Sequence, residues 1–455
     1  PLRMSTFLFA SIPVLAHPTN PLPFARRLLD RGHQVLWYAS AAYHEPLAAA
    51  GATVFPYRRA RDFGGAVLED EFPWLRTTGT IATLRRGFAE IFVGGAADRV
   101  ADLQEIIASH PVDAVLTEGL TFAPGLMHDL GGPVWATYGD GPLPPSGPET
   151  PPFGPGMLPM RGPLGMARNA IVGAVGRRLV FGPADRRYRE IRAELGLPPT
   201  NRPALEAMMS PFLHLQGCTP AFEYPQRRLP EQVHWVGALR PDPPDRWERP
   251  AWWSRVTDTG RPVVLVSQGS LRPDVTELLV PAIRGLAGMD VTAVVVTGLA
   301  DPTDVIDALG RDLPANVLLS RFVPYDLVLP HTSVFVTNGG YTGVTLALAH
   351  GVPLVQAGTT EEKHEIAARI EWTGVGVRLG TTRPTAEAVA GGVRRVLDDL
   401  RYRGAAGRVQ AEMAQHDAGN EGADLLEELA RTRTMVPRRD GGPRENAVSL
   451  PSPQR

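Results

Sequence analysis

The feature that most constrains this 455-residue chain is a repeated alternation of short apolar runs with segments whose apolar residues have helical spacing. The apolar runs of the first half lie at 6–14, 35–38, 53–55, 114–117, 134–137 and 212–216. The alternation restarts at 263–267, beyond a proline-rich polar stretch at 237–250. Strands that alternate with helices build parallel sheets covered on both faces. The sequence therefore predicts an α/β fold with two doubly wound, Rossmann-like domains.

The same pattern predicts the domain boundaries. We expect a first domain over 1–236, a linker over 237–250 and a second domain over 251–402. A helical region should follow over 403–432, and the proline-, arginine- and serine-rich tail over 433–455 should be disordered. In doubly wound sheets ligands bind at the carboxyl ends of the strands, so the predicted site is a cleft between the two domains.

Charge and cysteine content exclude several kinds of function. The formal net charge is −2, so no basic excess indicates a nucleic-acid partner. The single cysteine, Cys218, excludes an internal disulfide framework and a cysteine metal cluster. The chain has no Asp-x-Asp motif and no His/Glu pair at metal-ligand spacing, and we predict no metal site.

We also expect no stable membrane insertion, because no apolar run approaches the roughly 18 residues of a membrane helix. The apolar stretch 7–16 fits a buried first strand better than a signal sequence, since Arg3 is the only flanking basic residue and no small-residue cleavage site follows. The predicted location is cytoplasmic.

A glycine-rich turn lies between two apolar runs of the second half. Asn338-Gly339-Gly340 follow the run 334–337 and precede a helical segment, 344–350, that ends at Gly351. Glycines let a backbone approach a ligand closely, and a helix N-terminus favours an anion. The pattern is that of a phosphate site, but also of an ordinary turn in an α/β fold. Ser267-Gln268-Gly269-Ser270 repeat it after another strand.

Two titratable residues follow strands of the first half. His17 comes directly after the first strand, and a histidine can act as a general base near neutral pH. Glu118 follows the strand 114–117 and could hold the His17 ring in one tautomer. Taken singly, His17 is more simply explained as an ordinary surface or capping histidine and Glu118 as a solvated loop residue.

Several blocks together resemble the glycosyltransferase family that glycosylates plant secondary metabolites, macrolides and other bacterial natural products. The second-half blocks are Phe322-Val323-Pro324-Tyr325, Asn338-Gly339-Gly340, Gly351-Val352-Pro353 and Glu362-Lys363. The first-half blocks are His17, Pro23 and Arg31-Gly32-His33. The resemblance implies the GT-B fold, with the acceptor in the first domain and the nucleotide-sugar mainly in the second. It also implies that the helical region 403–432 crosses back to the first domain.

The resemblance assigns roles to individual residues. His17 falls on the catalytic base and Glu118 on its paired acid. Phe322 would stack on the nucleotide base, and the Val323 backbone would bind that base. The diphosphate would lie on the turn, and the remaining assignments are Glu362 and Lys363 for the sugar hydroxyls and Ser270, Asn338, Gly339, Gly340, Thr342 and Gly343 for the phosphates.

Two residues depart from the family pattern. Asn338 stands where the family has a phosphate-binding histidine, and an amide donates hydrogen bonds but carries no charge. Lys363 stands where the family has a sugar-binding glutamine. Leu346 replaces the ribose-binding glutamate of the plant branch, which favours the bacterial branch.

The predicted activity is an inverting sugar transfer, without a metal or other cofactor, from a thymidine or uridine diphosphate sugar to a hydroxyl or amine of an apolar small molecule. Two alternatives stay open: a nucleotide-sugar epimerase or hydrolase, and a binding protein whose catalytic site has decayed. A homodimer is compatible with the sequence.

Overall fold

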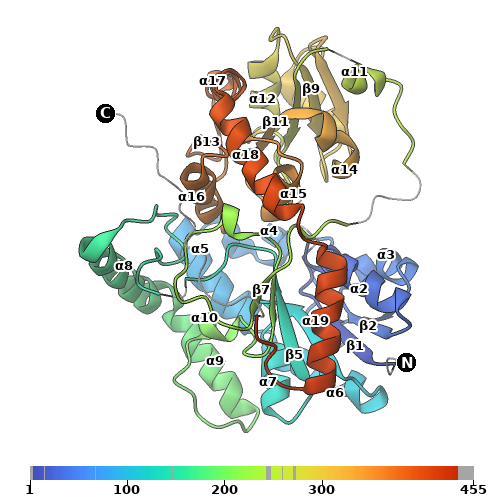
Figure 1. Cartoon of the computed structure of the whole chain (residues 1–455), viewed down its shortest axis with the longest axis vertical. Coiled ribbons are helices and arrows are strands. Elements are labelled where there is room, and N and C mark those ends of the chain that lie inside the picture. Colours follow the sequence, from blue (N-terminus) through green and yellow to red (C-terminus); the bar gives the residue numbers. More distant parts are fainter. Residues whose placement is uncertain are drawn as a thin grey trace.

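Two parallel sheets, each covered by helices, form the two domains of the computed structural model (Figure 1). The structure describes residues 4–438 except 15, 67, 146, 242–246, 259 and 270–272. The first sheet has the order β3-β2-β1-β4-β5-β6-β7 and the second the order β10-β9-β8-β11-β12-β13. Within the described residues, neighbouring strands of both sheets pair in parallel. The prediction of two doubly wound domains is confirmed.

The strands are short and largely buried. Those of the first sheet are β1 (Thr6–Ala10), β2 (Gln34–Tyr38), β3 (Thr53–Phe55), β4 (Ala114–Glu118), β5 (Val134–Gly139), β6 (His214–Gln216) and β7 (Val233–Trp235). Those of the second are β8 (Val263–Ser267), β9 (Thr292–Val296), β10 (Val317–Ser320), β11 (Thr332–Thr337), β12 (Leu354–Gln356) and β13 (Gly376–Arg378).

Helices cover both faces of each sheet. The helices of the first domain include α1 (Ala16–Thr19), α2 (Leu22–Asp30), α3 (His44–Ala49), α5 (Thr80–Gly87), α6 (Ala96–Ser109), α7 (Ala123–Asp129), α8 (Gly162–Gly176) and α9 (Gly182–Glu194). Those of the second include α12 (Leu279–Leu286), α13 (Pro302–Leu309), α14 (Tyr325–Val328), α15 (Tyr341–Ala349), α16 (Lys363–Thr373), α17 (Ala386–Asp398), α18 (Leu400–Met413) and α19 (Ala418–Thr432).

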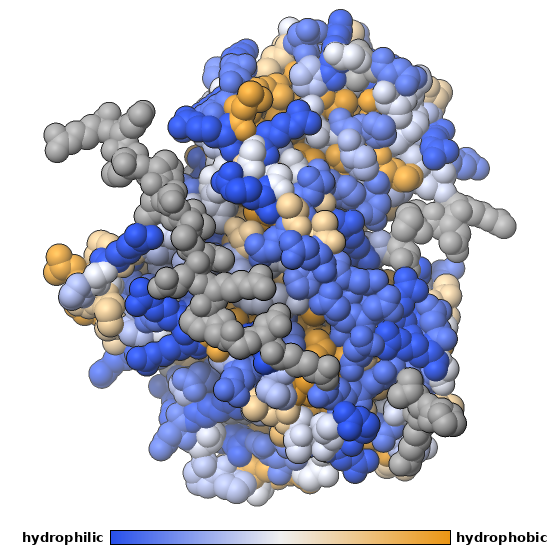
Figure 2. All heavy atoms as spheres, viewed as in Figure 1, coloured by the Kyte–Doolittle hydropathy of each residue, from blue (hydrophilic) through white to orange (hydrophobic). Residues whose placement is uncertain are grey.

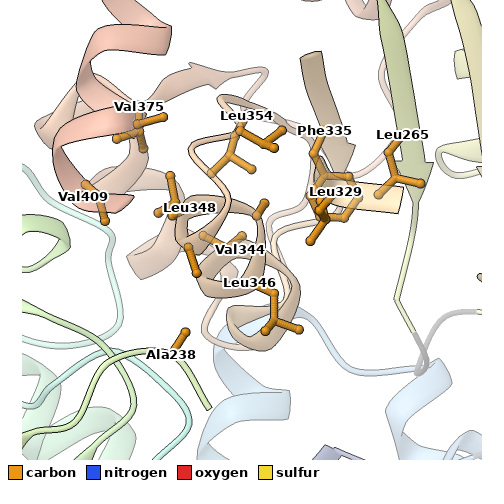
Figure 3. Packing of buried hydrophobic residues seen from close by; sticks show 14 of the residues in the cluster. Ala238, Leu265, Leu329, Phe335, Val344, Leu346, Leu348, Leu354, Val375 and Val409 are labelled. Atoms are coloured by element: carbon orange, nitrogen blue, oxygen red, sulfur yellow. The ribbon is translucent and has the colours of Figure 1, made fainter. Parts of the chain in front are cut away.

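Alternation of side chains along the central strands gives each sheet two cores. In β1, Phe7 and Phe9 point to one face, and Leu8 and Ala10 to the other, because successive residues of a strand face opposite ways. The second sheet behaves likewise. Figure 3 shows one of its cores, in which Val344, Leu346 and Leu348 of α15 lie among residues of neighbouring strands and α18. This packing fixes α15, and with it the turn that precedes the helix.

The last two helices link the domains. Helix α18 packs beside α15 in the second domain, whereas α19 lies along the first domain against α2 (Figure 1). A Cβ atom at Gly422 would lie 2.3 Å from the ring of Phe24, so a glycine is needed for this close helix contact. Arg31 Nη1 lies 2.6 Å from Asp424 Oδ1 and 3.1 Å from Glu427 Oε1. The chain thus returns to the first domain, as the resemblance implied.

The end of the described chain continues along the first domain. Val436 is buried and its N–H donates to the carbonyl of Phe212. Residues 433–438 are therefore ordered, although the sequence places them in a disordered tail, because one apolar side chain finds a buried site. The rest of that predicted tail, 439–455, lies outside the described residues.

Helix α8 projects from the first domain and carries exposed apolar side chains. Leu164, Ile171, Val175 and Leu179 are each more than half exposed, the last just beyond the helix. Figure 2 shows apolar surface at the outer end of this projection. Within the described residues, no helix combines the length and apolarity that crossing a membrane requires.

Candidate active site

His17 lies in the short helix α1, which follows β1 at the carboxyl edge of the first sheet. Its Nδ1 lies 2.7 Å from Oδ2 of Asp140, the residue that follows β5 at the same edge. Burial alone would lower the pKa of His17, but Asp140, with more distant contributions from Glu118 and Glu362, raises this pKa to about 9. Although burial opposes its charge, Asp140 has a lowered pKa because of His17. The pair is therefore an imidazolium–carboxylate ion pair in the free protein.

Glu118 does not contact the His17 ring. This carboxylate is fully buried at the end of β4 and accepts hydrogen bonds from the N–H of Ile12 and the hydroxyl groups of Thr121 and Tyr138. Burial raises the pKa of Glu118, although the charge of His17 opposes the shift. The direct acidic neighbour of His17 is thus Asp140 rather than Glu118, and the sequence prediction is corrected at this point.

Asn20 connects this pair to the second domain. Its Nδ2 donates to Oδ2 of Asp140 over 3.2 Å, and its Oδ1 accepts from the hydroxyl of Thr342 over 3.2 Å. Asn20 is only 4% exposed. Thr342 belongs to the first turn of α15, so the ends of β1 and β5 and the predicted diphosphate turn meet at one place.

The predicted diphosphate turn has the geometry of a helix-terminal anion site. Gly340 is the N-cap of the nine-residue helix α15, and the N–H groups of residues 341–343 have no partner within the helix. Gly339 has φ +91°, and a Cβ there would lie 2.8 Å from Nε2 of Gln356. Both facts require glycine at position 339. A Cβ at Gly343 would make only an ordinary contact, 3.5 Å from the ring of Phe335.

Asn338 holds two loops together. Its Nδ2 donates to the carbonyl of Gln268, and its Oδ1 accepts from the N–H of Gly340. One N–H of the Asn338 amide is thus used within the protein. The same nitrogen carries a second N–H, which could donate to a phosphate. Ser270, the other predicted phosphate ligand, lies outside the described residues.

Glu362 and Lys363 mark the start of α16. Lys363 is 5% exposed, and its Nζ pairs with the carboxylate of Glu361, whose φ of +49° is unusual for a non-glycine residue. Burial raises the pKa of Glu362, with Lys363 opposing the shift. Glu362 also contributes to the raised pKa of His17, so its carboxylate acts on His17 at longer range. Lys363 instead lines a small recess with Asn338 and Gly358.

Phe322 and Val323 lie between β10 and α14. The Phe322 side chain is 58% exposed, whereas Val323 is buried. The Phe322 carbonyl accepts from the hydroxyl of Ser320 over 3.0 Å, which fixes the loop. An exposed ring on a fixed loop is available for stacking.

Helix α16 also anchors the long proline-rich loop of the first domain. Nε of Arg369 lies 2.6 Å from Oε2 of Glu223, and its Nη1 lies 3.1 Å from Oε2 of Glu365. Oε1 of Glu365 accepts from the N–H groups of Gly154 and Gly156, each over 2.8 Å. All three charged side chains are buried. This buried ion-pair network joins α16, which begins at the predicted sugar site, to the loop between β5 and α8.

Comparison with known proteins agrees with this arrangement. The family described as "Erythromycin biosynthesis protein CIII-like, C-terminal domain" matches residues 288–429. Over 424 residues the chain is 39% identical to 4'-demethylrebeccamycin synthase of Lentzea aerocolonigenes, with 93% of this chain and 99% of the relative covered. The chain belongs to the natural-product glycosyltransferase family. This glycosyltransferase is also 30% identical over 438 residues to UDP-glycosyltransferase 2 of Phaeomoniella chlamydospora, covering 93% and 95% of the two chains.

Solved structures support the fold. The calicheamicin glycosyltransferase CalG4 has a TM-score of 0.73 at 19% identity, with 94% of this glycosyltransferase and 99% of CalG4 covered. The predicted family, the GT-B fold and the enzyme class are therefore confirmed. The individual roles of the site residues stay predictions.

Sequence reasoning missed Asp140 and Asn20. The signal for Asp140 was present, because a carboxylate directly follows the strand 134–139, as Glu118 ends its neighbour. Choosing between the two requires the path of α1, which decides where the His17 ring points. Asn20 had no comparable signal, since its partner Thr342 is distant in the sequence.

Proposed function

We propose that this glycosyltransferase transfers a sugar with inversion from a nucleoside diphosphate sugar to an apolar small molecule, with His17 as general base and Asp140 as the acid that orients it. The observation that carries the proposal is the contact of His17 Nδ1 with Asp140 beside the N-terminus of α15. In the tautomer of neutral His17 that carries its proton on Nδ1, this nitrogen faces Asp140 at 2.7 Å and Nε2 keeps its lone pair.

In the proposed reaction, the acceptor oxygen or nitrogen attacks the anomeric carbon of the donor while Nε2 of His17 takes its proton. The bond between that carbon and the diphosphate oxygen breaks, and the nucleoside diphosphate leaves with the electron pair. Asp140 stabilises the imidazolium that forms. Amides at the start of α15 stabilise the charge that develops on the leaving group, and Asn338 adds an uncharged donor. The proposal includes no metal ion.

Two bases are candidates for the nucleotide. One relative is named a UDP-glycosyltransferase, and a structural neighbour with a TM-score of 0.67 is a spinosyn rhamnosyltransferase complexed with thymidine diphosphate. Phe322 would stack on either base. The acceptor class is proposed from the relative that is named 4'-demethylrebeccamycin synthase, and a bacterial natural product is the expected type.

The test is sugar transfer from UDP- and TDP-sugars to a panel of apolar hydroxyl- and amine-bearing natural products, followed by mass spectrometry. His17→Ala should remove nearly all transfer while nucleotide binding, measured by calorimetry, stays close to that of the unmodified protein. Proton NMR of the product should show an anomeric configuration opposite to that of the donor. Unchanged turnover in His17→Ala, or a retained configuration, would contradict the proposal.

A parallel incubation with donor alone separates transfer from the alternative reactions. An epimerase or hydrolase would give an isomerised or free sugar without any acceptor. The proposal predicts that either product forms much more slowly than the glycoside.

A further inference from the structure

A continuous line of polar contacts runs from the proposed base to the proposed diphosphate turn. His17 Nδ1 contacts Asp140 Oδ2, the same oxygen accepts from Asn20 Nδ2, and Asn20 Oδ1 accepts from the Thr342 hydroxyl. The first three residues belong to the first domain, and Thr342 belongs to the second. The bond between Asn20 and Thr342 therefore exists only when the two domains are docked as in this structure.

Asn20 can serve both neighbours because of its chemistry. An asparagine amide presents a donor and an acceptor on opposite atoms, so one side chain can donate to a carboxylate and accept from a hydroxyl. Asn20 is almost fully buried, and a buried side chain with two fixed partners has little freedom to rotate. A change at the Thr342 end is therefore transmitted to Oδ2 of Asp140.

A ligand bound at the start of α15 would change the hydrogen bond that the Thr342 hydroxyl makes. This hydroxyl has a single proton, which it donates to Asn20 in the free protein. A diphosphate bound at the start of α15 would compete for that proton, since anionic oxygens are stronger acceptors than an amide. The occupancy of the donor site would thus alter what Asn20 offers to Asp140.

We propose that Asn20 is a positioning residue that couples donor binding and domain docking to the geometry of the His17–Asp140 pair. It acts through Asp140 and needs no contact with the substrate. The role of this coupling in catalysis rests on the proposed function. The coupling itself can be measured without turnover, as a change in the titration of His17 when Asn20 or Thr342 is replaced.

The experiment measures the titration of His17 by NMR in the free protein, with histidine-selective labelling and His17→Gln for assignment. The carboxylates that act on His17 are Asp140, Glu118 and Glu362. Asn20→Ala loosens Asp140 and should move the His17 titration midpoint from about 9 towards 6.5. Thr342→Val should move it less in the same direction, and Thr342→Ser, which keeps the hydroxyl, should restore it.

A double-variant cycle provides the decisive comparison. Because the line of contacts from Thr342 to Asp140 runs through Asn20, the variant Asn20→Ala/Thr342→Val should shift the midpoint no further than Asn20→Ala alone. Thr345→Val is the matched control, since among the described residues that hydroxyl donates only to carbonyls of its own helix. This control should leave the midpoint unchanged. Melting temperatures of all variants verify that each one folds.

Kinetics give the second readout. Asn20→Ala should lower kcat about tenfold, the usual cost of losing one hydrogen bond to a charged group, while UDP or TDP binding changes much less. Additive shifts in the double variant, or an unchanged midpoint in folded Asn20→Ala, would overturn the coupling. If the unmodified protein transfers no sugar but the NMR pattern holds, the proposed function fails and the coupling stands. If the protein transfers sugar but the His17 titration does not respond in this way, the coupling fails and the proposed function stands.

Discussion

Replacing Asp140 by asparagine gives the sharpest test of the proposed base. The surroundings of His17 raise its pKa from 6.5 to about 9, and Asp140 is the main favourable contributor. At about 1.4 kcal/mol per pKa unit, this shift corresponds to roughly 3.5 kcal/mol in favour of the imidazolium. In Asp140→Asn burial remains while the attraction is lost, so the pKa of His17 should fall to 6.5 or below.

The consequence for activity depends on pH in a specific way. A base with a pKa of about 9 is neutral in only about 1% of molecules at pH 7, so kcat/KM should rise tenfold per pH unit and level off above pH 9. Asp140→Asn should reach its plateau by about pH 7. That plateau should be lower by up to about a hundredfold, because the imidazolium formed in the transition state has lost its partner. Near pH 7 the lower pKa and the lower plateau nearly cancel, so the two proteins should have similar kcat/KM. At pH 9.5 the unmodified protein should exceed Asp140→Asn by nearly the whole difference between their plateaus.

The assay is therefore kcat/KM for the donor from pH 5.5 to 10, since this quantity reports the groups of the free enzyme. Glu118→Gln is the control, because Glu118 acts on His17 only at longer range and should change the profile less. Equal ratios of unmodified to Asp140→Asn activity at pH 6.5 and 9.5 would refute the reasoning.

Stability should follow the same linkage. The raised pKa of His17 stabilises the folded state fully below about pH 6.5, and this contribution is lost as pH rises through about 9. The difference in melting temperature between the unmodified protein and Asp140→Asn should therefore be largest near pH 6, where His17 and Asp140 are both charged, and should shrink towards pH 9.5.

Three further predictions concern other parts of the site. Phe322→Ala should weaken nucleotide binding about tenfold in calorimetry without changing the melting temperature, because the ring is exposed and stacking on a base contributes about 1–3 kcal/mol; unchanged affinity would exclude stacking. Arg369→Ala should lower the free energy of unfolding by about 3–5 kcal/mol, since it leaves Glu223 and Glu365 buried without their cation. Arg369→Lys, which keeps the charge, should lose less, and equal losses would contradict this. Transfer should persist after removal of divalent metals by EDTA and dialysis, and a loss that magnesium restores would contradict the metal-free proposal.

The sequence predicted what depends on local pattern and failed where geometry between distant segments decides. Apolar periodicity and glycine positions are local, so the two sheets and the turn before α15 could be predicted, whereas Phe322 was singled out only by the family resemblance. The partner of His17 was not. Glu118 and Asp140 both stand at strand ends on one sheet edge, and only the course of α1 between them selects Asp140. The ordered residue Val436 was missed for the same reason, since its burial depends on Phe212 more than 200 positions earlier.

The two departures from the family pattern have different physical consequences. The Asn338 amide donates one hydrogen bond to the carbonyl of Gln268. This bond holds the end of β8 against the predicted diphosphate turn. An uncharged residue can do this without repelling the nearby Lys363, whereas a protonated histidine would place two cations around the same recess. Lys363 is already neutralised by Glu361, whose left-handed backbone places its carboxylate on the ammonium group. A protonated histidine at position 338 would present a positive charge to a phosphate. With Asn338 in its place, that charge would have to come from Lys363, whose ammonium group is paired with Glu361. Replacement of the two residues is therefore better understood as one linked change than as two independent losses.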